Sequence, residues 1–86
     1  MKKNLIFERG LDVGRERVAL RLFRTTHGFS LERRVIERDH AAYVQVLPII
    51  ALGDLDRFAD ADPYSKELAA LYYEVRRHLL ENRVVE

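Results

Sequence analysis

Arginine recurs along the segment RVALRLFRTTHGFSLERRVIERD, residues 17–39. Of the residue types in this chain, it is the one whose pattern most clearly suggests a binding function. If the segment forms two paired strands, alternate residues of each strand share one face of the sheet. Guanidinium groups hold phosphates and an aromatic ring stacks on a base, so such a face suits single-stranded nucleic acid. The candidate nucleic-acid-binding residues are Arg17, Arg21, Phe23, Arg34 and Arg38.

Three other interpretations of the same row stay open. Glu32 and Glu37 lie among the arginines and would neutralise part of their charge, as on an ordinary solvated face. Phe23 and Ile36 would suit a contact with a second copy. The face would also fit an acidic protein partner. A register shift of one residue reverses every face assignment, so the pattern alone does not decide between these interpretations.

The other polar residues give no motif for metal binding. Aspartates recur in the loop GDLDRFADADPY, but counting from Asp54 puts Phe58 at the fifth position of a calcium loop, and counting from Asp60 puts Tyr64 there. Helix capping and a solvated face explain these acids better. The histidines lie far apart in the sequence, without the spacing of a zinc pair.

Motifs for catalysis are absent from the sequence as well. Neither Ser30 nor Ser65 lies in a nucleophile-elbow context, and there is no glycine-rich phosphate loop. A domain of this size has little room for a cleft in which two carboxylates converge. We therefore expect a protein without enzymatic activity and without a cofactor.

Length and charge favour a small domain that assembles. A chain of 86 residues holds one domain, residues 1–86, and buries a modest share of its surface, so a dimer interface would add stability. Residues 1–38 carry ten Lys or Arg against five Asp or Glu, whereas residues 39–86 carry five against nine. A basic first part and an acidic second part could meet in a homodimer.

The environment is predicted from what the chain lacks. There is no cysteine, which excludes a disulfide framework and a thiolate metal site. The apolar stretch after the initial lysines ends at Glu8, and the longest apolar run, VLPIIAL, is far below the about 20 residues that cross a bilayer. We expect a cytoplasmic protein that does not contact a membrane.

Alternating apolar residues predict strands over about 4–9, 17–25, 29–37 and 42–49. The segment GLDVG (10–14) is expected to form the first turn and THG (26–28) the second, with Gly28 at positive φ. Pro48 is expected to end regular pairing or to force a bulge. A helix over 41–52 is the alternative there, disfavoured by Pro48 and the valines.

The period changes after Gly53, where helices are predicted over about 54–61 and 63–81. Asp54 would cap the first helix, and Asp62 followed by Pro63 would begin the second. The apolar stripe of the second helix is Leu68, Leu71, Tyr72, Val75 and Leu79. The fold class is therefore α+β: an antiparallel β-meander of three to four strands, followed by a short helix and a long C-terminal amphipathic helix packed on one sheet face.

Two functions are compatible with this pattern. The first is a small protein-interaction or assembly domain that pairs with itself as a homodimer or with another protein. The alternative is a module that binds single-stranded DNA or RNA through an arginine-rich sheet face. Nucleic-acid binding requires Arg17, Arg21 and Arg34 to be free, whereas self-assembly predicts that they pair with acids such as Asp56, Asp60 or Glu74.

Overall fold

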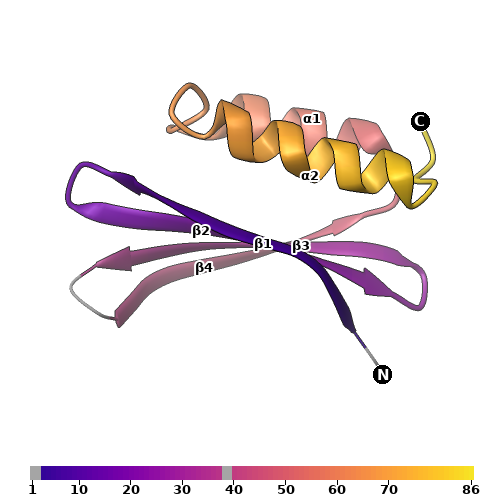
Figure 1. Ribbon diagram of the computed structural model, residues 1–86, viewed down its shortest axis with the longest axis horizontal. Helices are drawn as coiled ribbons and strands as arrows, with labels where there is room; N and C mark the ends of the chain where they lie inside the picture. Colours follow the sequence, from indigo (N-terminus) through magenta and orange to yellow (C-terminus); the bar gives the residue numbers. More distant parts are fainter. Residues whose placement is uncertain (1–2, 38–39) are drawn as a thin grey trace.

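The computed structural model describes residues 3–37 and 40–86 and shows one antiparallel sheet covered on one face by two helices (Figure 1). The sheet is a meander in the order β1-β2-β3-β4. The predicted α+β class and the order of strands before helices are confirmed. The elements are β1 (Asn4–Val13), β2 (Glu16–Thr25), β3 (Gly28–Glu37), β4 (His40–Ile49), α1 (Leu52–Ala61) and α2 (Ala69–Glu81).

The core lies between the helices and one face of the sheet. Val18, Leu20 and Leu22 alternate along β2 and are fully buried against the helix layer. Their neighbours Arg17 and Arg21 point to the opposite face, which no element described in residues 3–37 and 40–86 covers. The expected division of β2 into a core face and an open face is confirmed.

The first hairpin is longer than predicted. Residues 10–13 continue β1 and pair with β2, and the turn is confined to Gly14 and Arg15. Gly14 has a φ of 61°, which a two-residue hairpin turn of this hand favours. Gly10 does not turn the chain; it makes room, because a Cβ there would lie 3.0 Å from the Arg17 guanidinium.

The last strand begins earlier than predicted, at His40, and its pairing is regular at Pro48. Pro48 pairs with Ser30 and Ile49 with Phe29, so β4 passes through the proline, and the irregularity in register falls instead between Val35 and Ile36. An edge strand tolerates proline because its missing N–H can face away from the neighbouring strand. The helical alternative for residues 41–52 is wrong as far as Ile49.

The second helix begins later than predicted. Residues 63–68 form successive turns, and α2 starts at Ala69. The carboxylate of Asp62 accepts the N–H of Tyr64 but is otherwise held by side chains from other elements, so it does not act as a simple N-cap. The predicted apolar stripe is confirmed, since Leu68, Leu71, Tyr72, Val75 and Leu79 are all buried.

The N-terminus of the first helix is stabilised by a carboxylate from its own first turn. Asp54 lies in its first turn, where its carboxylate accepts the backbone N–H groups of Ile50 and Ala51 at 2.9 and 3.0 Å. These two hydrogen bonds hold the pKa of Asp54 below its usual value. The connection from β4 into α1 is therefore tight, and α1 lies over the β4 side of the sheet while α2 packs near β1.

Candidate functional site

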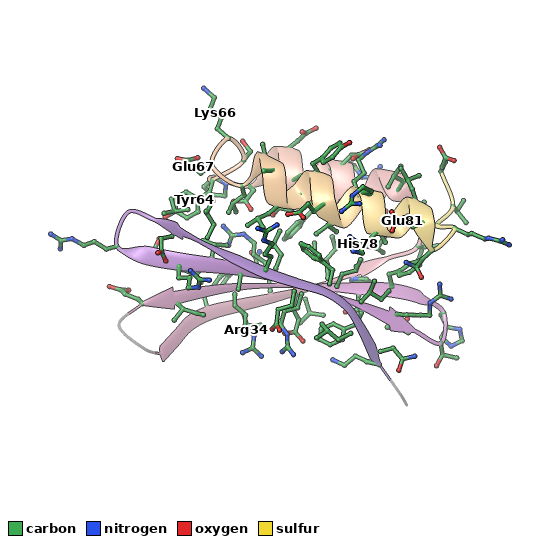
Figure 2. The ribbon with its side chains drawn as sticks, in the orientation of Figure 1. Arg34, Tyr64, Lys66, Glu67, His78 and Glu81 are labelled. Carbon is green, nitrogen blue, oxygen red and sulfur yellow. The ribbon has the colours of Figure 1, made fainter. Side chains whose placement is uncertain are left out.

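The predicted nucleic-acid-binding residues that the structure describes share the open face of the sheet. Arg21 pairs with Glu32 across β2 and β3, and Arg34 pairs with Ala19, so their side chains stand on the face away from the helices. Figure 2 shows Arg34 on that side, opposite the labelled residues of the helix layer. Arg38 lies outside the described residues.

Glu32 lies among three cations on this face. Its carboxylate lies 3.3 Å from Arg34 Nε, 3.7 Å from Arg21 Nη1 and 3.8 Å from Lys3 Nζ. The Glu32 side chain is only 10% exposed, so these contacts are shielded from solvent more than ordinary surface ion pairs. The three cations therefore share one anionic partner, which balances one of their three positive charges.

Two acids on β1 also lie near arginines of the open face. Arg17 Nη1 donates to Asp12 Oδ1 at 3.2 Å. Arg21 Nε lies 2.9 Å from Glu8 Oε2, although its N–H is not directed at that oxygen. These acids come from β1, next to β2 in the sheet, and not from the helices. Self-assembly was expected to pair the open-face arginines with acids such as Asp56 and Glu74. Within the chain, these two acids bind other arginines.

Phe23 is on the open face but is covered. Lys3 Nζ lies 4.7 Å and Arg21 Cζ 5.1 Å from the ring centroid, both at cation–π distance. The residue is 7% exposed. A nucleotide base would have to displace both cations before it could stack on this ring.

The edge strand β4 exposes apolar side chains on both faces of the sheet. Val44 and Val46, which are 45% and 61% exposed, belong to the open face, and Tyr43, which is 54% exposed, belongs to the helix side. No charged residue occurs from Tyr43 to Ile49. In the described part of the chain β4 pairs with β3 alone, so the backbone groups on its other side have no strand to pair with.

A buried ion pair lies beneath this edge, on the helix side. Arg33 Nε and Nη2 each donate to Asp62 at 2.8 Å in a bidentate arrangement. The Tyr72 hydroxyl donates to the same carboxylate at 2.5 Å. The side chains of Arg33 and Asp62 are 6% and 1% exposed. This network connects β3, the end of α1 and α2, and so fixes the helix layer on the sheet.

The network shifts the ionisation of its members. Burial would raise the pKa of Asp62, but hydrogen bonds from Arg33, Tyr72 and the Tyr64 N–H, together with the charge of Arg33, lower it below its usual value. Burial, and then the hydrogen bond to Asp62, raise the pKa of Tyr72. In the folded protein the carboxylate is therefore charged and the phenol neutral at ordinary pH.

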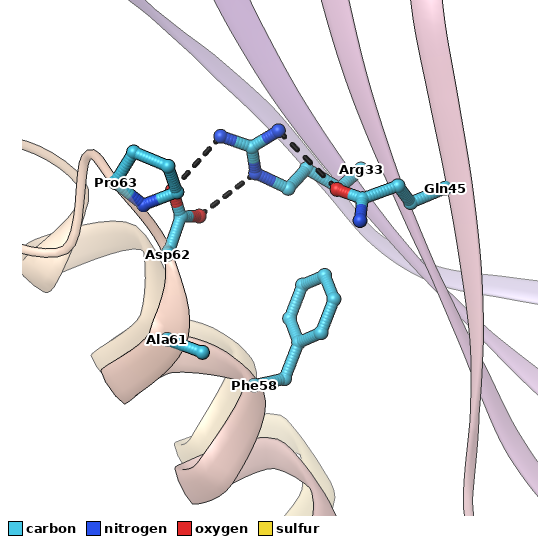
Figure 3. A pocket seen from close by; sticks show the side chains of 6 residues that line it. All are labelled: Arg33, Gln45, Phe58, Ala61, Asp62 and Pro63. Atoms are coloured by element: carbon cyan, nitrogen blue, oxygen red, sulfur yellow. Dashed lines mark hydrogen bonds and ion pairs between the residues drawn. The ribbon is translucent and has the colours of Figure 1, made fainter.

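A hollow of about 220 Å³ adjoins the ion pair (Figure 3). One side is polar, with Arg33 Nη1 3.4 Å from the side-chain oxygen of Gln45, at the long limit of a hydrogen bond. The other side is apolar. The hollow is lined by Arg33, Gln45, Phe58, Ala61, Asp62 and Pro63.

Sequence reasoning missed both the ion pair and the hollow. Arg33 shares its strand face with Phe29, Leu31 and Val35, all buried. A single arginine on an apolar face is the signal that a buried partner exists, but the partner is 29 residues away and could not be named from the pattern.

The described part of the chain shows neither a metal cluster nor a membrane-spanning helix. Residues 3–37 and 40–86 contain no cluster of three or more His, Asp or Glu side chains able to hold a metal ion. Over the same ranges, none of the helices combines the length and the apolar character needed to cross a membrane. No protein-family model, curated protein or solved structure matches the chain.

Proposed function

We propose that this protein is a non-enzymatic assembly domain that forms a homodimer through the free edge of β4. The observation that carries the proposal is the composition of this edge: ten residues of strand, exposed apolar side chains at Tyr43, Val44 and Val46, and no charge from Tyr43 to Ile49. Natural sheet edges are usually protected by charges, bulges or covering elements, because unpaired strands recruit other strands.

A second copy is the partner that fits the edge without further requirements. Two copies of β4 related by a two-fold axis perpendicular to the sheet would pair antiparallel, each presenting the same N–H and C=O groups to the other. No charged residue occurs from Ala41 to Ile49, so neither strand would bring a charged side chain against the other where these residues pair with one another. The product would be a continuous eight-stranded sheet with all four helices on one face.

The expected affinity is modest. Strand pairing along one edge contributes backbone hydrogen bonds and a narrow band of side-chain contacts, so the buried area would be at the low end of specific interfaces, near about 1,200 Å². Interfaces of that size associate and dissociate readily. We therefore expect a dissociation constant in the micromolar range, with monomer at low concentration and dimer at high concentration.

Sedimentation equilibrium over a wide concentration range tests the proposal, with two valine substitutions. Val46→Lys places a charge on the edge strand and is expected to weaken dimerisation by at least about tenfold. Val85→Lys is the matched control, because Val85 is 65% exposed, close to the 61% of Val46, but lies in the C-terminal tail beside Ala51. A wild-type protein that stays monomeric at the highest concentration, or equal weakening by both substitutions, would contradict the homodimer.

Nucleic-acid binding is a second candidate, favoured by the common placement of Arg17, Arg21 and Arg34 on the open face. It has less support, because each of these arginines has an acidic neighbour and Phe23 is covered. Fluorescence anisotropy of a labelled single strand at about 50 and about 200 mM salt tests it. We expect no binding at the lower salt; binding that Arg17→Glu with Arg21→Glu abolishes would establish the alternative.

A further inference from the structure

The hollow beside Arg33 is large enough for one aromatic side chain. An apolar cavity of about 150 Å³ accommodates benzene, and this hollow measures about 220 Å³. Phe58 and Pro63 supply apolar walls, while Arg33 Nη1 and the Gln45 amide supply a polar end. A phenol matches that division, with its ring on the apolar wall and its hydroxyl at the polar end.

The hollow adjoins the edge that the proposed dimer uses. Gln45, which contributes to its lining, belongs to β4, and Phe58 approaches from α1 above the same side of the sheet (Figure 3). Tyr43 is two residues from Gln45, on the same face of the strand, and is 54% exposed without lining the hollow of its own chain. A second copy would therefore bring an exposed tyrosine to the open side of the hollow.

Pro48 indicates which backbone groups of β4 face outward. Its nitrogen carries no hydrogen, so in a regular edge strand it faces away from β3. Residues 44 and 46 have the same parity, so their N–H and C=O groups also face the free edge. An antiparallel pair with a second copy can then place Val44 opposite Val44 as a hydrogen-bonded pair.

We propose that, in the β4-mediated dimer, Tyr43 of each copy inserts into the hollow of the other, in the register that pairs Val44 with Val44. This inference rests on the proposed homodimer and specifies its register and its anchor. In this register Tyr43 of the second copy lies directly opposite Gln45, where cross-strand Cβ atoms are about 5 Å apart. The two-fold axis makes both insertions equivalent, so the two hollows are filled together.

The contact would also complete the hydrogen bonding of Arg33. Nε and Nη2 of Arg33 are directed at Asp62, whereas Nη1, among the residues that the structure describes, has the long contact of 3.4 Å to Gln45. The inserted hydroxyl would accept from Arg33 Nη1 and donate to the Gln45 oxygen. A buried aromatic ring that fills a preformed hollow is the kind of residue that dominates the energy of an interface.

Sedimentation equilibrium with tyrosine variants tests the anchor. Tyr43→Ala is expected to raise the dissociation constant of the dimer by at least about tenfold, and Tyr43→Phe by a few fold, because it keeps the ring and loses the hydroxyl. Tyr73→Ala is the control, since Tyr73 is 67% exposed on α2. If Tyr43→Ala dimerises like the wild type while Val46→Lys does not, the insertion is wrong and the homodimer stands; if the wild type itself is monomeric, both are wrong.

Single cysteines test the register independently. The chain has no native cysteine, so Val44→Cys introduces the only thiol. In the proposed register the two Cα atoms at position 44 are about 5.5 Å apart, within disulfide range, whereas the two at position 46 are not opposite each other. We expect mild oxidation to crosslink Val44→Cys and not Val46→Cys. Crosslinking of Val46→Cys, or of neither variant in a protein that dimerises, would overturn the register.

Discussion

The two edges of the sheet differ in the charges that they carry. β1 carries Glu8, Arg9 and Asp12 and has a register irregularity between Leu5 and Phe7. From Tyr43 to Ile49, β4 is regularly paired with β3 and without charge. Charges and bulges are the devices by which natural sheets prevent strand addition. The pairing of β3 with β4 also has an irregularity, between Val35 and Ile36, and β4 carries Pro48, so the two edges differ chiefly in charge: β1 has charges that oppose strand addition, whereas the segment from Tyr43 to Ile49 has none.

The ion pairs beneath the two edges also differ, in how far they are exposed to solvent. On the β1 side, Arg9 Nη1 donates to both carboxylate oxygens of Glu74 on α2, and the two side chains are 61% and 25% exposed. On the β4 side, Arg33 and Asp62 are almost fully buried. Exposed pairs are screened by water and replaceable, whereas a buried pair leaves an uncompensated charge when one member is lost. Loss of one member of the ion pair should therefore destabilise the β4 side more than the β1 side.

Removal of the buried acid should have the largest effect. Asp62→Ala leaves the Arg33 guanidinium without its partner and the Tyr72 hydroxyl without its acceptor, so we expect a loss of about 3–5 kcal/mol in the free energy of unfolding. Urea denaturation measures it. Asp56→Ala is the matched control, because Asp56 is 49% exposed and meets Arg76 at 3.4 Å; we expect about 0–1 kcal/mol there. Comparable losses in the two variants would remove the distinction between the two kinds of pair.

The second largest effect is expected at the hairpin glycines, where a substitution near β4 should cost more stability than one at the β1–β2 turn. A Cβ at Gly28 would lie 2.9 Å from the Ile49 carbonyl oxygen, and its φ of 148° is rarely adopted by other residues. Gly28→Ala therefore has to move the end of β4, and we expect a cost of about 2–3 kcal/mol. Gly14, at the β1–β2 turn, has a φ of 61° and nothing within 4 Å of a Cβ, so Gly14→Ala should cost only about 1 kcal/mol.

Thermal melting of both glycine variants against the wild type measures this difference. A Gly14→Ala variant as unstable as Gly28→Ala would show that backbone conformation alone sets the cost, with no contribution from the contact with β4.

The sequence predicted the fold well wherever the information was local. Alternation along residues 17–37 correctly divided β2 and β3 into faces, and the stripe from Leu68 to Leu79 correctly identified the buried face of α2. The errors came from residues whose role is set at a distance. Asp62 looked like a helix cap because Pro63 follows it, but Arg33 and Tyr72 hold its carboxylate, and the helix starts at Ala69.

The arginine face was predicted from local sequence, whereas the cover on Phe23 and the hollow were not, because they depend on residues from several elements. Strand alternation placed Arg17, Arg21 and Arg34 on one face, as the structure does. It could not show that Lys3 and Arg21 cover Phe23, because that depends on side-chain positions across strands. The predicted meander did imply that β4 lies at an edge of the sheet, because the last strand of a meander has one neighbour. The hollow requires three elements to meet and has no local signal.

A change of pH alters the ionisation of Asp62 and Tyr72 and so changes the stability of the β4 side reversibly. The folded protein lowers the pKa of Asp62, so this stabilisation is present above about pH 4, the usual pKa of a free aspartate, and is lost as the pH falls. The raised pKa of Tyr72 acts oppositely: its contribution is present below about pH 10 and declines as the pH rises. Urea midpoints measured from neutral to alkaline pH should fall less steeply in Tyr72→Phe than in the wild type. Tyr73→Phe, which removes a hydroxyl at an exposed position of α2, is the matched control.

The smallest effect is expected from the ion pair on the β1 side, although its geometry is good. Arg9 Nη1 lies 2.8 and 3.0 Å from the two oxygens of Glu74. Because both groups contact solvent, a double-mutant cycle of Arg9→Ala and Glu74→Ala should give a coupling of about 0.2–1 kcal/mol, and that coupling should shrink as salt is raised to about 1 M. A coupling that persists at high salt, or that approaches the loss in Asp62→Ala, would mean that the β1 side is held as rigidly as the β4 side. The contrast between the edges would then reduce to the charges on the strands themselves, which Val46→Lys tests directly.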